Sequence, residues 1–271
     1  MGRSPHKKGT NQKGADQIKA VRYVEQKMNQ TYQKNNPETI QKMFGSIAKQ
    51  YDRTNAVLSF NLHRYWNQSL IKAVQSDRPM KQYLDLCAGT GEIAFTFLSQ
   101  RQTPVEAFLL DFSEEMLSCA QAKEKENPFK QHRIQYIQAD AQEIPLPSNS
   151  IDCVTIAYGI RNVKNPKACV EEVLRVLRPG GSFAILELTQ PDNPIMKLGH
   201  KIYLKTILPV VGKVIATNKE AYRYLCNSIQ AFTPPAQLES TLKEVGFEKT
   251  AQKPLTGGIA TIISGSKPEE L

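Results

Sequence analysis

Short apolar segments alternate with helix-forming segments from residue 82 onward, and this alternation constrains the fold more than any other feature. Five segments have the length and composition of buried strands: 83–87, 105–110, 134–138, 151–157 and 182–188. The stretches between them carry helix signals, such as Ser113 ahead of two glutamates and Asn165-Pro166 ahead of an apolar periodic run. Strands that alternate with helices in this way predict a parallel sheet with crossover helices.

The flanking regions extend this pattern. Two more strands are expected at 247–253 and 259–264, close enough to pair as a hairpin, after a helix that starts at Pro234-Pro235 and ends near Gly246. Residues 195–232 are expected to be a helical insertion. Upstream, residues 38–51 place apolar side chains on one helical face, and 56–72 carry a second apolar set. We therefore predict an α/β, Rossmann-like sheet of seven mostly parallel strands with a terminal β-hairpin, an N-terminal helical lid and a helical insertion before the last helix.

Composition excludes several classes of protein. No apolar run approaches the roughly 20 residues needed to cross a bilayer, and none near the N-terminus could act as a secretory signal. The five cysteines lack metal-ligand spacing, which indicates reduced thiols and predicts no metal site. These observations predict a cytoplasmic protein.

A glycine-containing turn follows the first predicted strand, in Leu84-Asp-Leu-Cys-Ala-Gly-Thr-Gly-Glu92. Gly89 and Gly91 permit a ligand to approach the backbone closely, because neither has a β-carbon. Taken alone, the turn also fits the relaxed dinucleotide pattern GxGxxA, and many turns with two glycines bind nothing.

Two aspartates follow the next two predicted strands. Asp111 lies 20 positions after Gly91, where a carboxylate can accept hydrogen bonds from both ribose hydroxyls of a nucleotide, although a surface aspartate could also begin a turn there. Asp140 can accept the exocyclic amine of adenine, while the Ala141 N–H reaches a ring nitrogen. Because a dinucleotide site has no comparable requirement, Asp140 favours S-adenosylmethionine over NAD, unless it is an ordinary loop aspartate that binds nothing.

These segments resemble a known group of enzymes, the class I S-adenosylmethionine-dependent methyltransferases. A narrower resemblance, to the ubiquinone/menaquinone biosynthesis C-methyltransferase family, runs from about Phe44 to Ser264. It is carried by Tyr51-Asp-x-x-Asn55, Leu58-Ser59, His63, Trp66, Gly159-Ile-Arg-Asn-Val163, Arg175–Gly181, Glu187, Tyr222–Leu225 and Leu255–Gly258. Two positions depart from the family pattern: Ala88 where the loop often has glycine, and Ala157 where many members have serine.

The resemblance implies a site and a reaction. S-adenosylmethionine would contact Thr90, Asp111, Asp140 and Ala141, and it would lie close to the backbone at Gly89. The substrate would be a lipophilic polyprenylated quinol, methylated on a ring carbon. Demethylmenaquinol is the expected substrate, and the 2-methoxy-6-polyprenyl-1,4-benzoquinol precursor of ubiquinone is the alternative. A quinol carbon is a weak nucleophile until a ring hydroxyl begins to lose its proton, so the enzyme must align the reactants and generate or stabilise a phenolate.

Arg161 and Asn162, just after the fourth predicted strand, are the catalytic candidates. Arg161 would stabilise the phenolate or orient a water, or else hold the Gly159 loop through an ion pair. His63 and Tyr51 are candidate proton acceptors or packed parts of the lid, and Trp66 is expected in the core.

The implied organisation is one methyltransferase domain over 38–267, with N-terminal helices over 38–80, a cofactor-binding core over 82–188 and a cap insertion over 195–232. Residues 1–34 hold eight basic and two acidic side chains of a chain with net charge +9. We expect a basic flexible tail over 1–37, with contact to RNA or to an anionic membrane as alternatives, and a short tail over 268–271. Segment 202–215 is expected either to cover the substrate with its lysines toward lipid headgroups or to form an ordinary cap.

Three other functions compete with this interpretation. A methyltransferase acting on another small molecule would share the cofactor site. An NAD-dependent oxidoreductase would leave Asp140 and the terminal hairpin unexplained. An RNA-binding protein could use the basic tail, but the sequence has no aromatic stacking platform, so no nucleic-acid partner is expected. Peripheral contact with the inner membrane face and a homodimer are open alternatives for the assembled protein.

Overall fold

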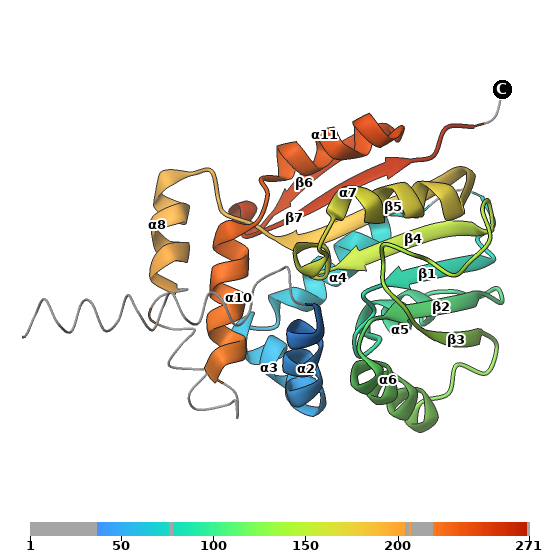
Figure 1. Cartoon of the computed structure of the whole chain (residues 1–271), viewed down its shortest axis with the longest axis horizontal. Helices are drawn as coiled ribbons and strands as arrows, with labels where there is room; N and C mark the ends of the chain where they lie inside the picture. The colour runs from blue at the N-terminus through green and yellow to red at the C-terminus, as the bar shows by residue number, and fades with distance from the viewer. Residues whose placement is uncertain (1–36, 76–77, 204–205, 207–218, 270–271) are drawn as a thin grey trace, which may run out of the picture.

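The computed structural model describes residues 37–75, 78–203, 206 and 219–269, and its centre is a seven-stranded sheet (Figure 1). The strand order is β3-β2-β1-β4-β5-β7-β6. Strands β1 to β5 pair in parallel, whereas β7 is antiparallel to both β5 and β6. The predicted Rossmann-like sheet with a terminal hairpin is confirmed. The strands are β1 Gln82–Leu86, β2 Glu106–Asp111, β3 Arg133–Gln138, β4 Ile151–Ala157, β5 Leu177–Leu188, β6 Glu248–Leu255 and β7 Ala260–Ser266.

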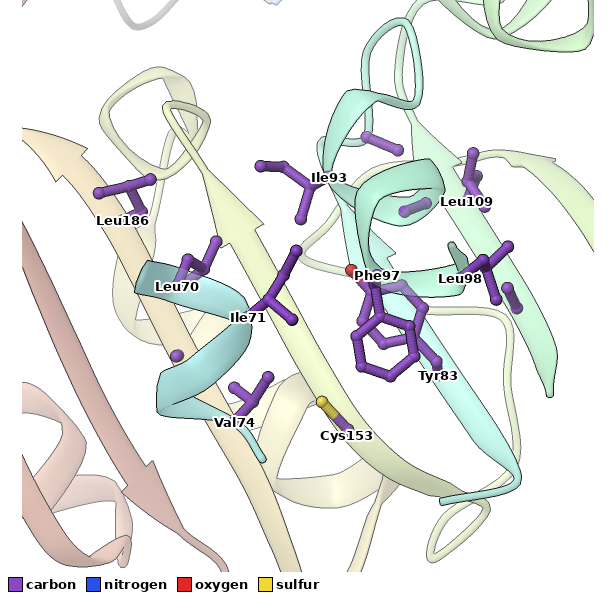
Figure 2. Close-up of a cluster of buried hydrophobic side chains, with 14 of the residues drawn as sticks. Leu70, Ile71, Val74, Tyr83, Ile93, Phe97, Leu98, Leu109, Cys153 and Leu186 are labelled. Carbon is purple, nitrogen blue, oxygen red and sulfur yellow. The ribbon is translucent and has the colours of Figure 1, made fainter. Parts of the chain in front are cut away.

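Helices cover both faces of the sheet. On one face lie α4 (Leu62–Ala73), α5 (Glu92–Leu98) and α6 (Glu114–Glu126), and on the other lie α7 (Pro166–Val176) and α11 (Pro235–Val245). Figure 2 shows the first of these layers, where side chains of α4 and α5 meet those of the central strands. Tyr83 and Phe97 stack there with ring centroids 4.0 Å apart. Because alternate side chains of a strand enter opposite layers, the central strands β1, β2, β4 and β5 are largely apolar on both faces.

Four further helices lie beyond the carboxyl ends of the parallel strands (Figure 1): α2 (Pro37–Ile47), α3 (Tyr51–Leu58), α8 (Pro194–Ile202) and α10 (Lys219–Ala231). The first two belong to the predicted lid, and the last two belong to the predicted insertion. Helix α4, which the predicted lid also included, instead packs on one face of the sheet. Lid and insertion touch each other, since Phe44 and Tyr224 pack edge to face with centroids 6.5 Å apart. Ligands of open α/β sheets bind at this end of the strands.

Local helix signals in the sequence are confirmed. The Ser113 side chain accepts a hydrogen bond from the Met116 N–H at the start of α6, and Asn165 does the same for the Ala168 N–H at the start of α7. Gly246 ends α11 with φ 113°, a conformation that glycine adopts without strain.

Three details of the predicted elements were wrong. The run 38–51 is broken into α2, a short 3-10 turn at Ala48–Gln50 and α3. The second apolar set, 56–72, spans two helices, because Phe60 and Asn61 take positive φ and turn the chain between α3 and α4. Helix α7 ends at Val176 and the fifth strand starts at Leu177, earlier than predicted, because Leu177 pairs with Ile151 of β4.

Some predictions fall on residues outside this description. They concern the basic tail, of which only Pro37 is described, and most of segment 202–215. The five cysteines are free thiols. Among the described helices, none combines the length and apolar character required to cross a bilayer.

Candidate active site

The glycine loop that joins β1 to α5 follows a left-handed path. Cys87, Gly89 and Gly91 have φ values of 53°, 56° and 80°. A β-carbon on Gly91 would lie 2.7 Å from the Phe95 ring, so a larger residue would displace that ring. The loop therefore presents backbone, rather than side chains, at the end of β1.

Asp85 of β1 holds this loop through hydrogen bonds of its buried carboxylate. Its two carboxylate oxygens accept hydrogen bonds from the Ala94 N–H at 3.1 Å and from the Thr155 hydroxyl at 2.9 Å. Burial raises the pKa of Asp85 to about 7, while these hydrogen bonds oppose that change. Asp85 thus ties the first turn of α5 to the ends of β1 and β4.

Asp111, the last residue of β2, connects that strand to the glycine loop. One carboxylate oxygen accepts the Gly89 N–H and the other accepts the Ser113 N–H, both at 2.8 Å. Burial raises the pKa of Asp111, and the two backbone donors offset part of that effect. A carboxylate has about four acceptor positions, so this carboxylate retains capacity for the two hydroxyls of a ribose.

Asp140 follows β3 and is oriented by its own loop. Its oxygens accept hydrogen bonds from the backbone and side-chain amides of Gln142, at 2.9 to 3.0 Å. Gln142 in turn accepts the Asn165 N–H at 2.9 Å, which links the loop to the start of α7. Gln142 thus holds the Asp140 carboxylate in place. The role of Gln142 could not be predicted from the sequence, because only its contact with Asp140 in the structure reveals it.

A cavity of about 280 Å³ lies between these strand ends and the four overlying helices. All seven residues predicted for the site line it: Gly89, Thr90, Asp111, Asp140, Ala141, Arg161 and Asn162. Residues as far as 73 positions apart in the chain are thus brought to one space because the carboxyl ends of parallel strands share an edge. The lining fits the adenosine half of S-adenosylmethionine, with two carboxylates for its polar groups and a loop of exposed backbone between them.

Arg161 is buried in the wall of this cavity, in the 3-10 turn Ile160–Asn162 that follows β4. Its guanidinium forms an ion pair with Glu187 of β5, and the two residues are 5% and 0% exposed. Burial, the largest single cause, would lower the pKa of Arg161, but the Glu187 carboxylate together with Tyr51 and Tyr224 outweighs it and the pKa is raised. Both expected alternatives for Arg161 are therefore compatible with its position, because the ion pair leaves Nε buried with no hydrogen-bond partner among the described residues. Nε is thus a buried charged donor without a partner in the described part of the chain.

Asn162 connects the strand end to the helical insertion. Its side-chain oxygen accepts the hydroxyl of Tyr224 on α10 at 2.7 Å. Phe44 packs edge to face against both Tyr224 and Tyr51, with centroids 6.5 Å and 6.1 Å apart. This half of the cavity is therefore aromatic, which suits a flat apolar ring.

Asp52, which sequence reasoning did not single out, closes the lid over the glycine loop. Its carboxylate accepts the Thr90 hydroxyl and forms an ion pair with Lys123 of α6, whose Nζ also donates to the Thr90 carbonyl at 3.0 Å. Thr90 is only 3% exposed beneath this clasp. In the sequence, only the Tyr51-Asp52 motif pointed to this residue. Its hydrogen-bond partner, Thr90, is 38 residues further along the chain.

Asp52→Ala is expected to accelerate dissociation of S-adenosylhomocysteine about tenfold, because a charge-assisted hydrogen bond contributes roughly 1.5–3 kcal/mol to lid closure. The ion pair is partly exposed, so stability should change by less than about 1 kcal/mol. Stopped-flow displacement measures the rate. Lys123→Ala, which keeps the Thr90 bond, should have a smaller effect, and equal rates in all three proteins would contradict the clasp.

The remaining candidates are also located. Trp66 is buried in the core, as predicted, and its indole N–H donates to Thr256 at 2.8 Å. Tyr51 and His63 both line the cavity and also belong to the lid region, so their position fits both expectations. Burial raises the pKa of Tyr51, which disfavours it as a proton acceptor.

Comparison with known proteins identifies relatives along almost the whole chain. A family model described as the ubiE/COQ5 methyltransferase family matches residues 29–267. A demethylmenaquinone methyltransferase of Protochlamydia amoebophila is 54% identical over 238 residues, covering 88% of this chain and 98% of that protein. A ubiquinone/menaquinone biosynthesis C-methyltransferase UbiE of Ectopseudomonas mendocina is 35% identical, covering 85% and 90%.

Solved structures share the fold at much lower identity. The [4+2]-cyclase SpnF aligns with a TM-score of 0.63 and 13% identity, covering 87% of this chain and 97% of that one. A SAM-dependent methyltransferase from Aquifex aeolicus aligns with a TM-score of 0.53 and 16% identity, covering 74% and 88%. Because a cyclase and a methyltransferase both align, this likeness establishes the fold only. The reaction has to be inferred from the residues of the site.

Proposed function

The chain belongs to the ubiE/COQ5 methyltransferase family, and from this premise we propose that it methylates a ring carbon of demethylmenaquinol. It is an S-adenosylmethionine-dependent methyltransferase, and the cofactor supplies an electrophilic methyl group. The relative at 54% identity is named for the demethylmenaquinone reaction, whereas the name of the relative at 35% covers ubiquinone as well. We therefore assign the naphthoquinol, rather than the benzoquinol, as the substrate.

One observation supports this function most strongly: the cavity has a nucleotide half and an aromatic half, with Arg161 in its wall. Asp111, Asp140 and the glycine loop would hold the adenosine. Phe44, Tyr51 and Tyr224 would enclose the quinol ring, and the free Nε of Arg161 would donate to a ring oxygen that becomes negative during methyl transfer. The chain's task is then to align the reactants and stabilise that oxygen.

The substrate assignment is tested by incubating the purified chain and S-adenosylmethionine with short-chain demethylmenaquinol or with 2-methoxy-6-prenyl-1,4-benzoquinol. Mass spectrometry should detect one added methyl group on the naphthoquinol ring. Methylation of the benzoquinol alone would overturn the substrate assignment. Methylation of neither ring would indicate that the enzyme acts on another small molecule.

We also propose that the enzyme meets its lipophilic substrate at a membrane surface. Ile195, Leu198 and Ile202 form one exposed face of α8, with exposed fractions of 81%, 60% and 52%. Phe60, 71% exposed at the turn between α3 and α4, packs against Tyr203 next to this face. Because Tyr203 also lines the cavity, an acyl chain or prenyl tail at this patch would lie near the entrance.

The triple variant Phe60→Ser, Ile195→Ser, Leu198→Ser is expected to lose at least about tenfold in vesicle binding, since each buried apolar side chain contributes roughly 1.5–3 kcal/mol. Flotation with vesicles of phosphatidylcholine, alone and mixed with phosphatidylglycerol, measures the bound fraction. Methylation of a short-chain quinol in detergent should be unchanged. If the unmodified chain floats with neither vesicle, the membrane proposal is wrong.

A further inference from the structure

His63 lies buried in the cavity wall with both ring nitrogens engaged. The Ser59 hydroxyl donates its single proton to the Asn55 carbonyl at 2.7 Å. The same oxygen lies 2.8 Å from Nδ1 of His63, so the hydroxyl and the ring nitrogen form a hydrogen bond.

The other ring nitrogen, Nε2, faces Oε1 of Glu92 at 3.2 Å. If His63 were neutral with hydrogen on Nδ1, lone pairs of Nε2 and a carboxylate oxygen would point at each other. A proton between the two atoms removes this repulsion. Nε2 of His63 therefore donates a hydrogen bond to Oε1 of Glu92, which fixes the position of the Glu92 carboxylate.

Glu92 lines the same cavity as His63. It is the first residue of α5, directly after Gly91, and its side chain is 34% exposed. Among the described residues, no hydrogen bond reaches Oε2. Burial raises the pKa of Tyr158, and the charge of Glu92 is the next largest contribution; Glu92 also adds to the raised pKa of Tyr51. Glu92 is thus electrostatically close to the aromatic half of the cavity.

Three other carboxylates line the described cavity, and each already has a protein donor at both of its oxygens. Both oxygens of Asp85, Asp111 and Asp140 accept hydrogen bonds from the protein. Arg161 is a cation and cannot accept a proton. Tyr51 and Tyr158 are phenols with raised pKa values, so they are poor acceptors. Glu92 is the carboxylate with a vacant oxygen.

From this geometry we infer that Glu92, held by His63, accepts the proton of the quinol hydroxyl, an inference that rests on the proposed function. The O–H bond breaks and its proton moves to Oε2, leaving its electron pair on the ring oxygen. That charge passes to the ring carbon, which bonds to the methyl group as the carbon–sulfur bond breaks and its pair stays on sulfur. The ring carbon then loses its own proton to water, which restores the aromatic ring, and Glu92 returns its proton to the ring oxygen, so that the product is the methylated quinol and one proton is released.

Glu92→Gln preserves shape and removes the acceptor, so kcat should fall about 100-fold or more. The affinity for S-adenosylmethionine, the melting temperature and KM for the quinol should change little. Glu92→Asp restores a carboxylate and should recover at least about a tenth of the original kcat. Glu171→Gln, an exposed substitution on α7, is the matched control and should behave as the unmodified chain.

The pH profile separates a base from a structural contact. Without Glu92, proton removal depends on hydroxide, so kcat of Glu92→Gln should rise about tenfold per unit between pH 7 and 9, whereas the unmodified chain should show no such rise. The ionisable groups facing Glu92 are His63 on α4, Tyr51 on α3 and Tyr158 after β4, with the Arg161–Glu187 pair beyond Tyr158. The two tyrosines stay neutral in this range because burial raises their pKa values.

Either of two results would overturn the inference: an unchanged kcat in Glu92→Gln, or a reduced kcat with the same pH profile as the unmodified chain. All comparisons use a quinol that the unmodified chain methylates. If it methylates no quinol at all, the proposed function fails at that step, before any Glu92 variant is compared.

Discussion

Replacement of Asp111 by alanine is expected to weaken binding of S-adenosylmethionine by at least about 100-fold. Hydrogen bonds to a charged acceptor contribute roughly 1.5–3 kcal/mol each, and two ribose hydroxyls would lose theirs. The same change frees the Gly89 N–H, which Asp111 holds at 2.8 Å, so the glycine loop also loses its anchor. Both effects destabilise the complex with S-adenosylmethionine and therefore raise its dissociation constant.

Calorimetric titration measures this loss, with two variants for comparison. Asp111→Asn keeps one acceptor oxygen but no charge, and its affinity should lie between those of the alanine variant and the unmodified chain. Asp192→Ala removes an exposed carboxylate ahead of α8 and should leave binding unchanged. An Asp111→Ala protein that binds within threefold of the unmodified chain would exclude Asp111 from the cofactor site.

Arg161→Ala should have two large effects, one on turnover and one on stability. Removal of a preorganised donor to a developing oxyanion typically costs about 100- to 1,000-fold in kcat. It also leaves the Glu187 carboxylate buried without its partner, which costs roughly 3–5 kcal/mol of folding free energy. Urea unfolding and methyl transfer to the quinol measure the two effects separately.

A double variant separates catalysis from folding. Arg161→Met with Glu187→Gln removes both charges, so most of the stability should return. Turnover should remain at least about 100-fold below that of the unmodified chain, while affinity for S-adenosylmethionine stays within a few-fold. If the double variant turns over normally, Arg161 serves only to hold its loop.

The sheet could be predicted from the sequence because each buried strand is a short apolar run bounded by turn residues. Residues 151–157 illustrate this, since the predicted strand and β4 coincide. The break between α3 and α4 could not be predicted in the same way. Phe60 and Asn61 adopt positive φ there, although neither is a glycine, and tertiary contacts such as Phe60 with Tyr203 accompany the turn.

The cofactor half of the site was more predictable than the substrate half. Gly89, Asp111 and Asp140 each lie at a strand end or within three residues of it, so the topology alone brings them together. Asp52 and Glu92 owe their positions to packing between distant elements: α3 against the glycine loop, and α4 against α5. No spacing in the chain encodes these contacts, and their roles become visible only when the partners are in place.

The central claim is that the ends of β1, β2 and β3 form an adenosine site for S-adenosylmethionine rather than for a dinucleotide. Calorimetry of the purified full chain, titrated separately with S-adenosylmethionine and with NAD, tests it most directly. One molecule of S-adenosylmethionine should bind per chain, and NAD should give no saturable heat. Saturable binding of NAD together with no heat from S-adenosylmethionine would contradict the claim.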